Sequence, residues 1–224
     1  MCFSAEASFG ASAVLGAVGV VCLRKVSNPK QYLFAAIPVF FALQQFSEGF
    51  VWLSLIDPDW SGFRKIPAYF FLIFALLVWP VWLPLSLWFI ETRPKIKKLL
   101  SAAVGFGLLF ALILGFFLFN HSVSPEIKSH HIHYALGFSG GLVQSASLLY
   151  FIPTIIPPFL SILKRVWVLG LFLLVSYLVS KFYFADAIVS VWCLIAAFIS
   201  FIVLWALFEM KDQENPELKL SGMN

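Results

Sequence analysis

Residues 99–119 read LLSAAVGFGLLFALILGFFLF, and this stretch decides the fold because it is apolar and carries no charged side chain. A helix that crosses the hydrocarbon core of a bilayer needs about 20 predominantly apolar residues, which is the length of this run. The whole chain shares this character: 61% of its 224 residues are hydrophobic and 12% are charged, with a mean hydropathy of +0.94. Soluble domains carry about 25% charged residues, so the composition argues strongly against a water-soluble fold.

Other runs of the same kind predict an all-α, polytopic membrane protein folded as a seven-helix bundle. Each run is long enough to cross the bilayer once. We expect membrane spans at residues 5–23, 33–55, 67–90, 99–119, 133–155, 166–183 and 186–209. Together they form one membrane domain over residues 1–210, which is followed by a short polar cytoplasmic tail at 211–224.

The basic residues predict the orientation of the bundle. One side of the membrane would hold Arg24, Lys25, Lys30, Arg93, Lys95, Lys97, Lys98, Lys164, Arg165, Lys211 and Lys219. The other side would hold Arg64, Lys65, Lys128 and Lys181. Cytoplasmic loops are enriched in lysine and arginine, so this bias predicts an outer N-terminus and an inner C-terminus. The basic residues are scattered in short loops rather than gathered on one face, so orientation explains them better than nucleic-acid binding.

Glu48 is the one acidic residue well inside an apolar run, and it is the leading candidate for a catalytic or ligand-binding side chain. An ionised carboxylate in hydrocarbon costs at least about 2.5 kcal/mol, so this residue should face other helices or a cavity. Gln44 and Trp52 lie four residues on either side and share its helix face, with Gln45 beside them. We expect an outward-facing polar pocket here. The alternative is a carboxyl group that only locks the bundle through hydrogen bonds.

The histidines offer a second candidate site in the outer half of the molecule. All of them lie in one outer loop or at the entry to the fifth span. His130, His131 and His133 could converge on one metal ion, such as zinc, if they lie in a loop. They lack the His-x-x-x-His spacing that would place two imidazoles on one helix face. The alternative is a solvated loop that tolerates histidines and binds nothing.

Two further residues complete the predicted ligand-binding set. Asp186 lies in the turn before the seventh span, and Trp192 lies one to two turns into that span. Both are within reach of the same outer vestibule, although such residues are also ordinary at a membrane interface. The inner end of the bundle is expected to offer only loop cations and apolar packing. Any site should therefore open outward.

Three stretches together resemble a known family: MCFSAEASF at 1–9, QQFSEGFVW at 44–52 and SVWCLIAAF at 190–198. They are similar to a family of small bacterial integral membrane proteins of unknown function whose members begin MCFSA and carry a QQxxEGxxW pattern. The resemblance covers almost the whole chain. It implies a seven-helix, multi-pass protein of a bacterial inner membrane. It also places seven residues in the family's motifs: Cys2, Gln44, Gln45, Glu48, Trp52, Trp192 and Cys193.

Four classes of function stay open. The favoured one is binding or sensing of a small or lipid-like ligand beside Glu48. A covalent retinal is excluded, because the seventh span has no lysine to form the Schiff base. The main alternative is a metal-dependent membrane hydrolase of ceramidase-like type, with zinc on the histidines and Glu48 as general acid or base. A proton-coupled transporter or a structural membrane subunit would also be compatible with a buried acid, and the oligomeric state is open.

Overall fold

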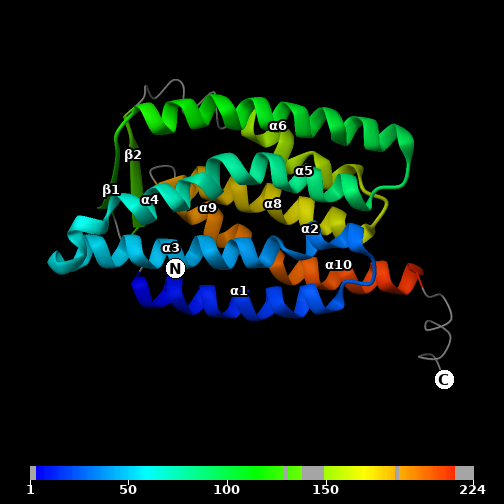
Figure 1. Ribbon diagram of the computed structural model, residues 1–224, viewed down its shortest axis with the longest axis horizontal. Coiled ribbons are helices and arrows are strands. Elements are labelled where there is room, and N and C mark those ends of the chain that lie inside the picture. The colour runs from blue at the N-terminus through cyan, green and yellow to red at the C-terminus, as the bar shows by residue number, and fades with distance from the viewer. Residues whose placement is uncertain (1–3, 129–130, 138–148, 185–186, 215–224) are drawn as a thin grey trace.

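The computed structural model describes residues 4–128, 131–137, 149–184 and 187–214, and it is a bundle of long helices lying side by side (Figure 1). Within these ranges, six helices are long and apolar enough to cross a membrane: Ala5–Lys25, Pro29–Ile56, Lys65–Ile90, Pro94–Asn120, Lys164–Tyr183 and Ile188–Lys211. They confirm six of the predicted spans as apolar helices. They also support the assignment to multi-pass, mainly helical membrane proteins.

Several of these spans are built from more than one helical element. In chain order the elements are α1 (Ala5–Lys25), η1 (Pro29–Gln31), α2 (Tyr32–Ala35), α3 (Ile37–Ile56), η2 (Pro58–Phe63), α4 (Lys65–Leu72), η3 (Ile73–Val78), α5 (Trp79–Ile90), α6 (Pro94–Asn120), η4 (Pro157–Leu160), α8 (Lys164–Tyr183), α9 (Ile188–Ala197) and α10 (Ile199–Glu214). The segment η3 is π-helical and joins α4 to α5 without a loop. The seventh predicted span, 186–209, is divided at Phe198 into α9 and α10. α10 continues to Glu214, inside the predicted polar tail, and 215–224 lie outside the described residues.

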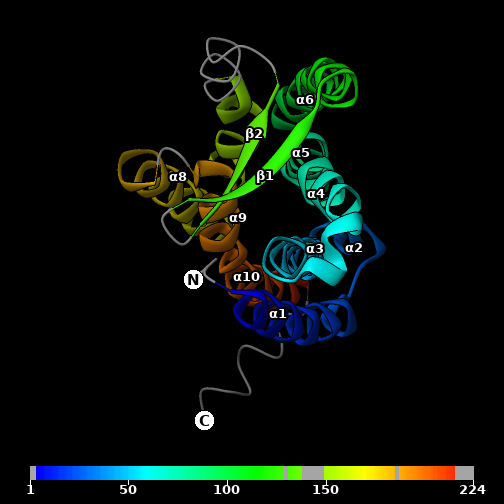
Figure 2. The ribbon, with the colours of Figure 1, turned by 90° about the vertical axis from the view of Figure 1, so that its left-hand side faces the viewer.

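An antiparallel pair of strands closes one end of the bundle. β1 (Val123–Lys128) pairs with β2 (His131–Leu136), with Val123 opposite Leu136 and Lys128 opposite His131. Figure 2 looks onto this end and shows both strands lying across the helix ends. The N-terminal end of α1 and the C-terminal ends of α6 and α8 also lie here. We call this the hairpin end.

The predicted fifth span, 133–155, is wrong at its start, because residues 131–136 form a strand. The physical reason is alternation: Ile132 and Tyr134 are 0% and 7% exposed and face the bundle, where Tyr134 stacks on Phe71. A period of two residues fits a strand that lies on an apolar surface, and it does not fit a helix. Residues 149–155 of this span are helical, and 138–148 lie outside the described residues.

The opposite end gathers most of the basic residues. Arg93, which precedes α6, donates from Nη2 to the carbonyl oxygen of Leu160 at 2.6 Å. Arg165 lies 3.9 Å from the carboxylate of Glu209, and Lys25 lies over the ring of Phe208. The described basic residues in these helix ends and loops are Arg24, Lys25, Lys30, Arg93, Lys95, Lys97, Lys98, Lys164, Arg165 and Lys211. We call this the basic end.

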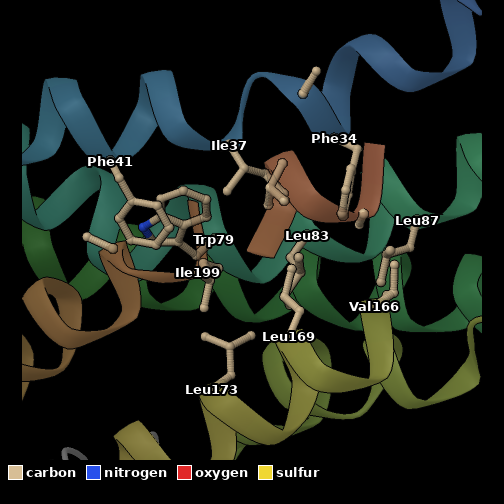
Figure 3. Close-up of a cluster of buried hydrophobic side chains, with 14 of the residues drawn as sticks. Phe34, Ile37, Phe41, Trp79, Leu83, Leu87, Val166, Leu169, Leu173 and Ile199 are labelled. Carbon is tan, nitrogen blue, oxygen red and sulfur yellow. The ribbon is translucent and has the colours of Figure 1, made fainter. Parts of the chain in front are cut away.

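An apolar core fills the bundle between the two ends. Figure 3 shows side chains of α2 and α3 meeting those of α5, α8 and α10. The labelled residues are Phe34, Ile37, Phe41, Trp79, Leu83, Leu87, Val166, Leu169, Leu173 and Ile199, and all of them are buried. Lipid tails are as apolar as these side chains, so close packing rather than removal from water holds the helices together.

Candidate functional site

The inner face of α3 carries polar side chains that are shielded from lipid. Gln44, Gln45 and Glu48 are each 0% exposed, and Trp52 is 3% exposed. Phe46, on the opposite face of the same helix, is 49% exposed. This burial confirms that the polar stripe faces neighbouring helices, as its spacing of three and four residues predicts.

Glu48 joins α3 to α9. The hydroxyl of Ser190 donates to Glu48 Oε1 at 2.5 Å, although the two residues are 142 positions apart in the chain. From α5, Trp79 Nε1 donates to Gln44 Oε1 at 2.9 Å. The buried thiol of Cys193 lies within interaction range of Gln44 and Glu48. Three helices thus meet around Glu48, and we call Gln44, Gln45, Glu48, Trp52, Ser190 and Cys193 the Glu48 cluster.

The carboxamide of Gln45 is the least satisfied group in this cluster. Neither its Nε2 nor its Oε1 has a hydrogen-bond partner in the part of the chain that the structure describes. Trp52 Nε1 and the hydroxyl of Ser8, on the neighbouring α1, likewise have no partner there. A buried polar group without a hydrogen bond costs about 1–3 kcal/mol. The cluster therefore has hydrogen-bonding capacity to offer, both as donor and as acceptor.

A cavity of about 30 Å³ lies beside the Glu48 cluster, in the middle of the bundle. Its walls are apolar and largely aromatic, and they include Trp79, Tyr150, Trp192 and Cys193. Trp192, one of the predicted binding residues, lines the cavity. Its Nε1 donates a hydrogen bond to Ser176 Oγ at 3.0 Å. About 10–15 Å³ holds one water molecule, so the cavity has room for about two to three water molecules. Glu48 is thus enclosed in the bundle next to a small apolar cavity, and the outward opening of the pocket stays a prediction.

The described histidines of the predicted metal site lie in β2 rather than in a loop. His131 is 9% exposed and packs edge-on against Phe184, and His133 is the cross-strand neighbour of Glu126. By the alternation of a strand, both residues lie on the face of β2 opposite to Ile132, and of the two His131 is the more buried. Among the described residues, no group of three or more His, Cys, Asp or Glu could hold a metal ion. His130 and Asp186 lie outside those residues, so zinc binding stays a prediction.

Comparison with known protein families gives a match over nearly the whole chain. Residues 1–217 of the chain match DUF6629, described as a family of unknown function. The chain belongs to this family. Membership agrees with the resemblance to an uncharacterised family, and it brings no activity with it. No curated protein and no solved structure matches the chain.

The basic end contains a buried acid that the sequence analysis missed. The Glu91 side chain is 3% exposed, and Arg93 donates to it from Nε at 3.0 Å and from Nη2 at 2.8 Å. The backbone N–H groups of Thr92 and Arg93 also donate to its Oε1. The expectation that this end holds only loop cations and apolar packing was therefore wrong. An acid at the end of an apolar run resembles an ordinary interfacial residue, so its position alone does not distinguish Glu91.

The Glu91–Arg93 pair predicts a specific pH dependence of stability. The hydrogen bonds from the Arg93 side chain are the main reason why the pKa of Glu91 lies below its ordinary value of 4.5. Because the folded-state pKa is lowered, the stabilisation is present above pH 4.5 and is lost as the pH falls below it. Arg93 is 39% exposed, so we expect Arg93→Met to cost only about 1 kcal/mol at neutral pH. Thermal unfolding in detergent should show this loss shrinking in acid, whereas the neighbouring Lys95→Met should show no such trend.

Proposed function

We propose that this protein crosses a bacterial inner membrane seven times, with its N-terminus outside, and binds or senses a small ligand at the Glu48 cluster. A crossing beyond the six described helices, at the predicted fifth span, is supported by where the described segments on either side of it lie. β2 ends at the hairpin end, whereas Leu160 accepts a hydrogen bond from Arg93 at the basic end. The described segments on either side of 138–148 thus lie toward opposite ends of the bundle, which is what one further crossing requires. The excess of Lys and Arg at the basic end favours a cytoplasmic location for it.

The carboxamide of Gln45 is the observation that carries the ligand-binding proposal. It is fully buried, and both of its polar atoms lack partners among the described residues. A ligand with a hydroxyl or amide group offers both a donor and an acceptor, so it could satisfy Gln45. Glu48 lies about one helical turn further along the same face, within reach of the same small ligand.

The neighbouring cavity narrows the class of ligand. Its volume of about 30 Å³ and its apolar walls suit a methyl-sized group. This favours a small molecule over a long-chain lipid at the cluster itself. A ligand that competes for Glu48 would also alter the Ser190–Glu48 bond between α3 and α9. Because this hydrogen bond joins α3 to α9, ligand binding at Glu48 would change the packing of these two helices, as a sensor requires.

The proposal is tested by identifying small molecules that co-purify with the protein. Wild type, Gln45→Leu and the lipid-facing control Phe46→Leu are purified in mild detergent and extracted for mass spectrometry. We expect one compound with wild type and with Phe46→Leu, depleted roughly tenfold in Gln45→Leu because two hydrogen bonds are lost. Absence of any compound from wild type, or equal amounts in all three proteins, would refute ligand binding. A higher melting temperature of Gln45→Leu without loss of a compound would instead support a purely structural cluster.

A further inference from the structure

A second, larger cavity lies at the basic end, far from the Glu48 cluster along the bundle axis. Its volume is about 310 Å³, which falls in the range of roughly 300–1,000 Å³ that small-molecule sites occupy. It forms where the loops after α1, α5 and η4 meet the end of α10. Residues from all four contribute to its wall, among them Lys30, Glu91, Thr92, Ile162 and Met210.

The cavity lies at an end of the bundle whose charge is predominantly positive. The helix ends and loops of the basic end carry the ten basic residues named above, against Glu91, Glu209, Asp212 and Glu214 in the sequence. Of these charged residues, Lys30 and Glu91 line the cavity itself. Glu91 and Glu209 are each paired with an arginine, at 2.8 and 3.9 Å respectively. Lys30 is exposed at the wall of the cavity. An anionic group is therefore the complement of this site.

Aromatic side chains place the cavity at the depth of lipid head groups. Tyr32 and Trp167 are 53% and 51% exposed and lie at the basic end of their helices. Trp88 lies beneath the ammonium group of Lys97, which is 4.0 Å from its ring centroid. Tryptophan and tyrosine concentrate at the boundary between hydrocarbon and water. The wall of the cavity combines apolar and polar groups, and its Ile162 is 64% exposed.

We propose that this cavity binds the head group of an anionic phospholipid such as phosphatidylglycerol. The phosphate lies against Lys30, the hydroxyls of the head group meet the polar wall near Thr92, and the acyl chains leave past Ile162 into the bilayer. Basic pockets between membrane helices on the cytoplasmic side are a recurrent solution for such head groups. This site is independent of the Glu48 cluster, and its occupant is a lipid rather than a small ligand.

Native mass spectrometry of delipidated protein, given equal amounts of phosphatidylglycerol and phosphatidylethanolamine, tests this site. Wild type should retain phosphatidylglycerol preferentially, and Lys30→Ala should lower that preference about fivefold. Lys65→Ala, which removes an exposed lysine at the hairpin end, is the matched control and should leave the preference unchanged. Thr92→Trp, which adds bulk at the wall, should lower retention of the lipid without changing the net charge.

Three results would overturn the inference. Equal retention of both lipids by wild type would show that the basic end does not select charge. An equal fall in Lys30→Ala and Lys65→Ala would assign the preference to net charge rather than to this cavity. Full displacement of the lipid by excess soluble glycerol phosphate would assign the cavity to a free anion.

Discussion

Gly107→Ala should be the most destabilising single-methyl substitution considered for this protein, with a loss of roughly 3 kcal/mol. A Cβ atom at Gly107 would collide with the carbonyl oxygen of Pro80 and lie 2.8 Å from its carbonyl carbon. Backbone atoms cannot rotate away, so α5 and α6 would have to separate. Because these two helices form one of the main packing contacts of the bundle, their separation weakens the whole core. The measurement is the thermal unfolding midpoint in detergent.

Gly105 supplies the matched control on the same helix. An added Cβ there meets no atom within 4 Å, so Gly105→Ala should be neutral or stabilising by up to about 1 kcal/mol through helix propensity alone. Equal midpoints for the two alanine variants would contradict the close approach of α5 and α6.

Loss of the Ser190–Glu48 hydrogen bond is expected to have the second largest effect. Ser190→Ala removes the donor from a fully buried carboxyl oxygen, at a cost of about 1–2 kcal/mol. Glu48→Gln changes the acceptor while nearly keeping the volume of the side chain. In a double-mutant cycle of Ser190→Ala and Glu48→Gln, thermal unfolding should reveal a coupling of about 1 kcal/mol between the two positions.

The double-mutant cycle needs a control substitution at a residue that lies far from Glu48. Ser101 is this control, because its hydroxyl accepts a hydrogen bond from Trp88 at the surface of α6. The effects of Ser101→Ala and Glu48→Gln on stability should be additive. Additivity of Ser190→Ala with Glu48→Gln would show that α3 and α9 are not joined through this bond.

Length and hydropathy predicted most of the spans because the bilayer imposes one length on every crossing. The failure at 133–155 came from a short apolar stretch that suits either a strand or a helix. Tyr134 resolves the choice by stacking on Phe71, which is a tertiary contact that sequence spacing does not reveal, and Ile132 is fully buried on the same face of the strand. The π-helical segment Ile73–Val78 and the break at Phe198 also had no local signal that we recognised.

The candidate site was predictable in part. Trp192 and Cys193 on α9 were named from the sequence, but their contact with the polar stripe of α3 was not. The four-residue spacing of Gln44, Glu48 and Trp52 defined a polar face because helical periodicity fixes it. Ser190 and Trp79, which bond to that face, come from helices distant in the sequence. The cavity at the basic end depends on three loops and the end of α10 meeting in space, so no single segment of the sequence indicates it.

The most direct test of the account is an experimental density map of the protein in lipid nanodiscs, at a resolution that distinguishes water from larger molecules. We predict that Glu48 faces Ser190 inside the bundle, and that a molecule larger than water lies within hydrogen-bonding distance of the Gln45 carboxamide. A cluster that holds water alone, or a Gln45 side chain directed toward lipid, would contradict the proposed binding site.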